Sequence, residues 1–238
     1  MPSSTRQDLP SWTAEATFKA AVLNKMRQLS RVTPKSRIAN EFVFGSTGVR
    51  ADLAIFGREL TGVEIKTDRD SLKRLSRQME AYRLHCHRVI LAIAPKHLVG
   101  ALRVVPDDVE IWTVRYGKVE TVRRGATARD VLPETCTLLT QAERARSGIA
   151  PTAGTITDPK HVRRAVKILA ARFDRTSDQF WTEVRGRAIA PEDIGLLSRF
   201  RSARELAAQT QEAQKAEWDN WESQAALIFG PRTSAIAA

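Results

Sequence analysis

Residues 50–82 read RADLAIFGRELTGVEIKTDRDSLKRLSRQMEAY and decide the predicted fold of this chain. Residues 50–56 alternate between the two faces of an extended chain, and residues 61–67 do so again, as half-buried strands do. The short segment 57–59 between them contains a glycine, so the two runs predict a β-hairpin. A helix is expected next over residues 71–87, with a buried stripe at Leu72, Leu75, Met79, Tyr82 and Cys86.

The segments around this hairpin extend it into a layered fold. Helical spacing predicts a helix over residues 13–29, with an apolar face of Phe18, Val22, Met26 and Leu29. A short strand is expected at residues 41–44, and the continuous apolar run at residues 89–93 predicts a central strand. Residues 109–114 and 119–122 predict a second hairpin. Either Asp68 or Asp70 is expected to cap the helix after the first hairpin. The order of these elements predicts the α/β class.

Composition after the second hairpin predicts a change in organisation. Residues 148–158 are rich in Gly, Pro, Ala and Thr, which predicts a linker between a domain at 1–147 and a helical region at 159–238. Helices are expected at 161–173, 178–187, 191–199 and 202–229, with a shared core of Trp181, Trp218 and Trp221. This region is interpreted as an appendage packed on the first domain, and the alternative is a separate helical DNA-binding module.

The charge balance predicts an acidic partner. The chain of 238 residues has a formal net charge of +11 and a pI of about 10.2, which favours nucleic acid as the partner. The two cysteines give no disulfide framework and suit a reducing compartment. The first ten residues are polar and no segment is long and apolar enough to cross a bilayer, so a cytoplasmic protein without a membrane partner is expected. The sequence contains no glycine-rich phosphate-binding motif, so no nucleotide cofactor is expected.

The hairpin also carries a candidate site. Asp52 lies near the start of its first strand, and Glu64 and Lys66 share one face of the second strand. Cross-strand neighbours have Cβ atoms about 5 Å apart, so both carboxylates are able to reach one Mg²⁺ or Mn²⁺ ion. The Ile65 carbonyl is a further candidate ligand. The alternative is a solvated strand face with a surface salt bridge.

The spacing of Asp52 and Glu64-Ile65-Lys66 resembles the PD-(D/E)XK nuclease superfamily, although Arg50-Ala51 replaces the usual proline before the first acid. Gln78 and Tyr82 resemble the Q-x-x-x-Y helix of its exonuclease-like branch. The run is similar to small bacterial and phage nuclease-like proteins. Lys66 is expected to contact the attacking water or the scissile phosphate. The resemblance implies a restriction-endonuclease-like core and metal-dependent hydrolysis of DNA. It also implies that Gln78 positions Lys66 or DNA and that Tyr82 packs nearby.

Further residues are weighed as contacts to DNA or as supports of the site. Backbone contacts are expected from Arg50, Arg69, Lys73, Arg74 and Arg77, and Arg50 alternatively pairs with an acid. Glu15 and Glu41 are weighed as supporting acids of the site. The alternatives are an ordinary acid in the first turn of a helix for Glu15, which is favoured, and a surface acid at a strand end for Glu41. Two rival functions remain: a non-catalytic DNA-binding or assembly protein with a nuclease fold, and a regulator whose C-terminal helices read DNA. Cutting both strands of a duplex would call for a homodimer.

Overall fold

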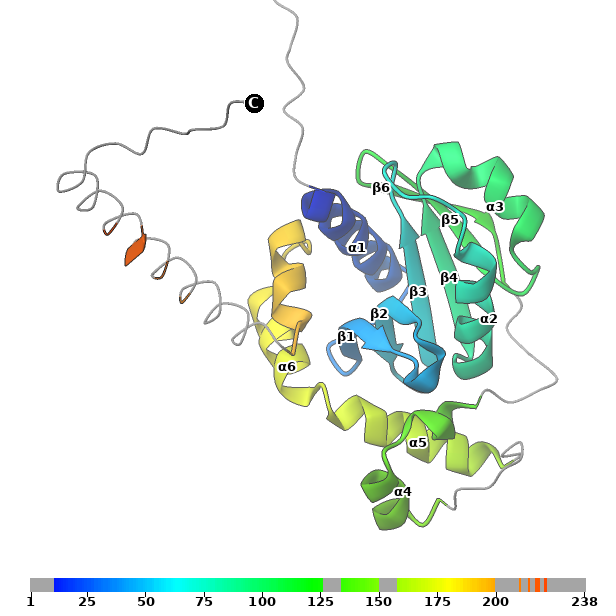
Figure 1. Ribbon diagram of the computed structural model, residues 1–238, viewed down its shortest axis with the longest axis vertical. Coiled ribbons are helices and arrows are strands. Elements are labelled where there is room, and N and C mark those ends of the chain that lie inside the picture. Colours follow the sequence, from blue (N-terminus) through cyan, green and yellow to red (C-terminus); the bar gives the residue numbers. More distant parts are fainter. Residues whose placement is uncertain are drawn as a thin grey trace, which may run out of the picture. The chain divides into compact units, whose positions relative to one another are not determined.

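The computed structural model describes residues 11–125, 134–149 and 158–199, together with residues 210, 214, 217, 218 and 221. The chain divides into two compact units, Met1–Ser198 and Arg199–Ala238. The first unit contains every strand described and the candidate site (Figure 1). No helix in these described ranges combines the length and apolar character that a membrane span requires.

The first unit is built on a mixed sheet whose strands follow one another in chain order. The strands are β1 (Arg37–Val43), β2 (Arg50–Phe56), β3 (Leu60–Lys66), β4 (Arg88–Ile93), β5 (Glu110–Arg115) and β6 (Lys118–Arg123). Strand β4 runs parallel to β3 and β5, and the remaining neighbours are antiparallel. The predicted α/β class, both hairpins and the central position of β4 are therefore confirmed.

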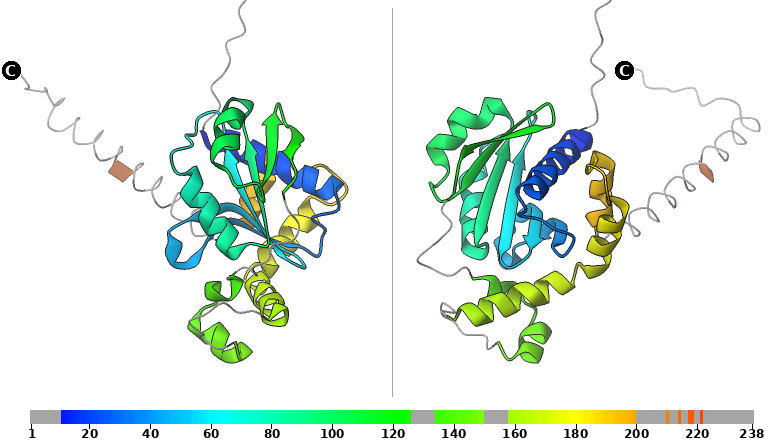
Figure 2. Two further views of the ribbon diagram at one scale, coloured as in Figure 1. Left: turned by 90° about the vertical axis from the view of Figure 1, so that its right-hand side faces the viewer. Right: turned by 180° about the vertical axis from the view of Figure 1, so that it is seen from behind.

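Helices cover both faces of the sheet, as Figures 1 and 2 show from three sides. On one face α1 (Ser11–Gln28), α6 (Asp174–Glu183) and the 3₁₀ helix η4 (Pro191–Leu197) share a core with Leu53, Ile55, Val63 and Ile65. On the other face α2 (Leu75–His85), α3 (Leu98–Val104) and α5 (Pro159–Ala171) share a core with Ala54, Phe56, Leu91 and Ile93. The period-two alternation of β2 thus divides its side chains between two cores. The short helices η1 (Gly45–Thr47), η2 (Pro95–His97), η3 (Thr135–Leu138) and α4 (Gln141–Ser147) complete the unit.

The first helix buries the predicted apolar face except at its end. Val22 and Met26 are buried, and Phe18 packs at the edge of the same core. Leu29 is 43% exposed, because α1 ends at Gln28 and the chain turns away there. The prediction for Leu29 was therefore wrong.

Helix α2 begins later than the sequence predicts, at Leu75, and no side chain caps it. The Asp70 carboxylate instead accepts hydrogen bonds from Thr67 N and Thr67 Oγ1, both at 2.7 Å. Such local bonds compete with helix formation, so neither Asp68 nor Asp70 acts as the expected cap. The helix packs tightly on β3, because a Cβ on Gly62 would lie 2.6 Å from Tyr82 Cδ1.

The compact unit continues beyond the predicted linker, of which residues 150–157 lie outside the described residues. Helix α5 buries Val162, Val166 and Leu169 in the core with α2, and α6 buries Phe180 in the core with α1. The division falls after Ser198, so 148–158 is not the boundary between the two compact units.

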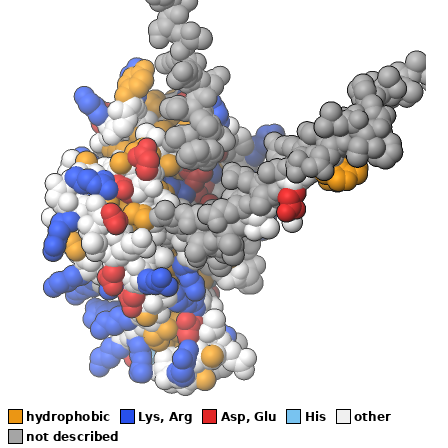
Figure 3. Space-filling view, turned by 90° about the vertical axis from the view of Figure 1, so that its left-hand side faces the viewer, with side chains coloured by type: hydrophobic (Ala, Val, Ile, Leu, Met, Phe, Trp, Pro, Cys, Tyr) orange, Lys and Arg blue, Asp and Glu red, His pale blue; other side chains and the backbone are white. Residues whose placement is uncertain are grey.

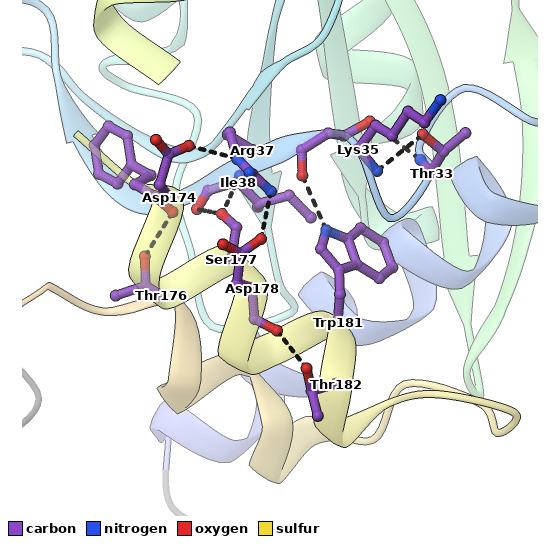
Figure 4. A network of polar contacts seen from close by, with 12 residues as sticks. Thr33, Lys35, Arg37, Ile38, Asp174, Thr176, Ser177, Asp178, Trp181 and Thr182 are labelled. Atoms are coloured by element: carbon purple, nitrogen blue, oxygen red, sulfur yellow. Dashed lines mark hydrogen bonds and ion pairs between the residues drawn. The ribbon is translucent and has the colours of Figure 1, made fainter. Parts of the chain in front are cut away.

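Figure 4 shows how α6 is tied to the start of β1. Arg37 pairs with Asp174 at 2.6 Å and with Asp178 at 2.7 Å. Ser177 Oγ accepts a hydrogen bond from Ile38 N, and Trp181 Nε1 donates to Ser36 O at 2.9 Å. These contacts, with the shared core, make α6 part of the first unit.

The three tryptophans predicted to form one core belong to different units. Trp181 is buried in the first unit, whereas Trp218 and Trp221 belong to the second unit and are 61% and 56% exposed. Their indole rings contact each other, with centroids 5.3 Å apart. Most of the helix expected at 202–229 lies outside the described residues.

Candidate active site

The site lies where β2 and β3 separate. Their pairing ends at Leu53 opposite Val63. Beyond that point β2 pairs only with β1, and β3 continues along β4 through Lys66. The Asp52 carboxylate enters the gap, and its Oδ2 accepts a hydrogen bond from Ile65 N at 2.6 Å. A side chain thus replaces the strand that would otherwise pair with Ile65.

Glu64 is the most enclosed acid of the site, with 1% of its surface exposed. Its Oε1 accepts hydrogen bonds from Lys66 Nζ at 2.5 Å and from Gln78 Nε2 at 2.6 Å. Its Oε2 accepts one from the Tyr82 hydroxyl at 2.7 Å, and that hydroxyl accepts one from Asp52 N at 3.2 Å. Helix α2 therefore fixes Glu64 from one side and links it to the backbone of Asp52.

These groups open into a cleft of about 530 Å³. Its acidic and neutral lining includes Glu15, Asp52, Glu64, Ile65, Asp70 and Gln78. Its basic lining consists of Lys66, Arg50, Arg74 and Arg77. Acids thus share the cleft with arginine and lysine side chains, which attract phosphate.

The two carboxylates influence each other strongly. Burial, followed by the charge of Glu64, raises the pKa of Asp52 from 3.8 to about 8, although the Lys19 ammonium and the bond from Ile65 oppose the change. Burial and the neighbouring Glu64 also raise the pKa of Tyr82 well above 10.0, so its hydroxyl stays a hydrogen-bond donor. Negative charge at Asp52 is therefore under-compensated by the protein itself.

Lys19 is a participant that the sequence reasoning missed. It is 2% exposed, its Nζ donates to Asn40 Oδ1 at 2.7 Å, and it forms an ion pair with Glu15 one turn earlier on α1. Its charge acts on Asp52. The i, i+4 spacing of Glu15 and Lys19 was the available signal, because it places a carboxylate and an ammonium on one side of a helix.

The predicted supporting acids have different positions. Glu15 lines the cleft, as expected for a residue near the site. Glu41 does not line it; the residue has a left-handed backbone with φ of 62°, and its carboxylate lies 3.8 Å from Arg50. Arg50 lines the cleft and faces the acid Glu41, and its contact with a phosphate stays a prediction.

The predicted DNA-contacting side chains also separate into two groups. Arg50, Arg74 and Arg77 line the cleft, and Arg77 Nη2 donates to Thr47 O at 3.1 Å. Arg69 and Lys73 are exposed but are not among the lining residues.

Comparison with known proteins assigns the chain to a family. Residues 10–198 match the family model described as bacteriophage P4 protein cII. The chain belongs to this family. The match spans the whole sheet and both helical layers, so the family is defined by the unit that contains the cleft.

Two individual proteins are similar to this member of the cII family. Protein cII of Enterobacteria phage P4 is 39% identical over 74 residues, which span 31% of this chain and only 28% of that protein. A solved structure, the SPO1766 protein of unknown function from Silicibacter pomeroyi, is similar over 63% of this chain and 99% of its own. Its TM-score is 0.41 and its sequence identity is 19%.

The donors in the cleft suit a hard divalent cation. The described residues contain no group of three or more His, Cys, Asp or Glu side chains arranged to hold a metal. The set consists instead of Asp52, Glu64 and the Ile65 carbonyl. Lys66 O accepts a hydrogen bond from Ala94 N, just after the end of β4. The preceding residue, Ile65, therefore directs its backbone groups to the other side of β3, into the gap that holds the Asp52 carboxylate. Two carboxylates suffice for Mg²⁺, which keeps several of its waters.

Proposed function

We propose that this member of the cII family is a metal-dependent nuclease of the PD-(D/E)XK type that hydrolyses DNA phosphodiester bonds. The observation that carries the proposal is the meeting of Asp52, Glu64 and Lys66 in one cleft at the separation of β2 and β3. Gln78 and Tyr82 both donate hydrogen bonds to Glu64, which supports a positioning role for both residues.

Mg²⁺ or Mn²⁺ would be held by the Asp52 and Glu64 carboxylates and the Ile65 carbonyl. The raised pKa of Asp52 supports this assignment, because a cation compensates the charge that burial and Glu64 disfavour. When bound, the cation supplies Lewis-acid stabilisation of the charge that develops on the phosphate.

The protein's own side chains supply orientation and local charge. Lys66 presents a buried ammonium beside Glu64, where it orients a water for attack and offsets negative charge on the scissile phosphate. Gln78 and Tyr82 hold the Glu64 carboxylate in one orientation, so they are positioning residues. This preorganisation keeps the charged groups fixed before DNA arrives.

The DNA backbone is proposed to enter over the arginines of the cleft. Arg50, Arg74 and Arg77 supply phosphate contacts at the site, and Arg69 and Lys73 extend the basic surface before α2. Such contacts give affinity and orientation but little sequence discrimination. The two cysteines are free and buried, which is consistent with a protein that acts in the reducing cytoplasm.

A cleavage assay tests the proposal. The full chain should cut duplex DNA in Mg²⁺ or Mn²⁺ and stop in EDTA, and Asp52→Asn or Lys66→Met should lose the activity while retaining the fold. Glu120→Gln and Lys118→Met, which change exposed residues of β6, serve as matched controls. Binding of DNA without cleavage in either metal would support the non-catalytic alternative. Undiminished cleavage by both site variants would refute the assignment of the site.

A further inference from the structure

A second groove lies at the opposite end of the β2–β3 hairpin. Its volume is about 540 Å³, and it is formed by the α1–β1 connection, the turn after β2 and the end of α5. Its charged lining residues are Arg31, Lys35, Arg37, Arg58, Lys167 and Asp174. Cations therefore dominate the charged lining of this groove.

The cations of this groove are of two kinds. Arg31 is paired with Glu110, and Arg37 is paired with Asp174 and Asp178. Lys35, Arg58 and Lys167 are exposed, and within the described part of the chain none of their side chains has an acid partner. Their charges are thus available to a polyanion without the breaking of an internal ion pair.

Helix α5 extends the same surface away from the groove. Lys160, Arg163 and Arg164 lie on the side of the helix that Lys167 occupies, and all are exposed. The opposite side is buried through Val162, Val166 and Leu169, so α5 is held with its basic side toward solvent. Figure 3 shows Lys and Arg side chains gathered over the lower part of one face, the level at which α4 and α5 lie in Figure 1.

We propose that this groove and the exposed side of α5 bind the sugar-phosphate backbone of duplex DNA, as a contact surface separate from the active-site cleft. Single-stranded nucleic acid is normally held on exposed aromatic platforms. The aromatic lining residue of the groove is Phe56, which is 1% exposed, so the surface offers charge without stacking. The proposal rests on the DNA partner of the proposed function and is independent of hydrolysis.

The position of the groove separates its role from catalysis. Asp52 and Phe56 lie four residues apart on β2, or about 13 Å at the rise of a strand. The groove residues therefore do not contact the candidate metal ligands. Their loss should weaken DNA binding while the cleft keeps its composition.

The test is DNA binding by the full chain in EDTA, measured by fluorescence anisotropy with a labelled duplex over a range of salt concentrations. The variant Lys35→Gln/Arg58→Gln/Lys167→Gln should bind about 10- to 100-fold more weakly near 0.1 M salt, and the log–log salt slope should fall by about 2 to 3. A matched variant, Arg103→Gln/Lys118→Gln/Arg124→Gln, removes the same charge from exposed positions of α3, β6 and the residue after β6. It should retain nearly all affinity.

The results of this binding experiment test the groove separately from the cleavage assay. A charge-preserving variant, Lys35→Arg/Arg58→Lys/Lys167→Arg, should bind as the natural sequence does. Equal weakening by the groove variant and the matched variant would overturn the proposal, because only net charge would then matter. Absence of duplex binding by the natural sequence, or stronger binding to a single strand of equal length, would also overturn it. Binding without cleavage would leave this surface supported and refute only the nuclease proposal.

Discussion

Two buried glutamates of the sheet have similar surroundings and different consequences. Glu64 near the end of β3 and Glu110 at the start of β5 are each 1% exposed. Each accepts a hydrogen bond from a buried aromatic side chain, Tyr82 at 2.7 Å and Trp112 at 2.8 Å. Each also lies beside a cation. Burial and pairing alone therefore do not distinguish a functional acid from a structural one.

The difference lies in the surrounding charge and access. Glu110 is paired with Arg31 at 2.8 Å, has Arg88 at 3.8 Å, and Arg31 lies over the Trp112 ring. Positive charge thus exceeds negative charge around it. Glu64 is paired with Lys66 and influences a second carboxylate, Asp52, and both acids line a cleft. Two neighbouring carboxylates in an open cleft are accessible to a cation from solution, whereas Glu110 has its counter-charge within the protein.

The largest effect expected from this comparison is on catalysis. Lys66→Met should lower the rate of DNA cleavage by at least about 100-fold, because it removes the group that we propose orients the water. Glu110→Gln should leave the rate unchanged at temperatures where it is folded. Rates at saturating Mg²⁺ measure both, and a similar loss of rate in the two variants would erase the distinction.

For stability we expect the opposite order, with a larger effect at Glu110 than at the candidate active site. Glu110→Gln should lower the free energy of unfolding by about 2 to 3 kcal/mol, because Arg31 and Arg88 lose a buried partner. Asp52→Asn should change it by less than about 1 kcal/mol, since an amide oxygen still accepts the bond from Ile65 N. Urea denaturation of both variants decides this. Greater destabilisation by Asp52→Asn would count against the structural role of Glu110.

A third carboxylate, that of Glu143, extends the comparison to the pH dependence of stability. Hydrogen bonds from Arg172 lower the pKa of Glu143 from 4.5 to about 2. Its folded-state pKa is depressed, so its stabilisation is present above pH 4.5 and is lost as the pH falls toward 2. Glu143→Gln should remove at most about 3 kcal/mol of stability at neutral pH and flatten the decline below about pH 5. Thermal melts of both proteins across this range should converge near pH 2; parallel curves would contradict the pairing.

The smallest predicted effect concerns the orientation of Glu64. Tyr82→Phe removes one hydrogen bond to Glu64 and should lower the cleavage rate by about tenfold, with about 1 kcal/mol of stability lost. Metal affinity should fall together with the rate. A normal rate and affinity would show that Gln78 and Lys66 hold the carboxylate without Tyr82.

Local patterns predicted much of the fold. The alternation of β2 and β3 identified the hairpin, and the apolar run of β4 identified the central strand, because these signals depend on neighbouring residues and burial. The joint position of Asp52, Glu64 and Lys66 followed from the hairpin. The late start of α2 was missed because Asp70 bonds locally to Thr67.

Other features depend on partners distant in sequence. The separation of β2 from β3 arises because each continues along a different neighbour, β1 or β4, which the hairpin itself does not specify. The Lys19–Asn40 bond joins residues on different elements. Helices α5 and α6 pack on opposite faces of the sheet, and this depends on tertiary contacts. Helical periodicity therefore predicted the helices but not the face on which each one packs.

The central claim is that Asp52 and Glu64 hold one divalent cation. Its most direct test is anomalous scattering from crystals of the protein soaked in Mn²⁺. The account predicts a single strong peak at the separation of β2 and β3, with carboxylate oxygens of Asp52 and Glu64 at about 2.0 to 2.2 Å from the ion. Crystals of Asp52→Asn should lose the peak. A fully soaked crystal with manganese elsewhere and none between these two side chains would contradict the account.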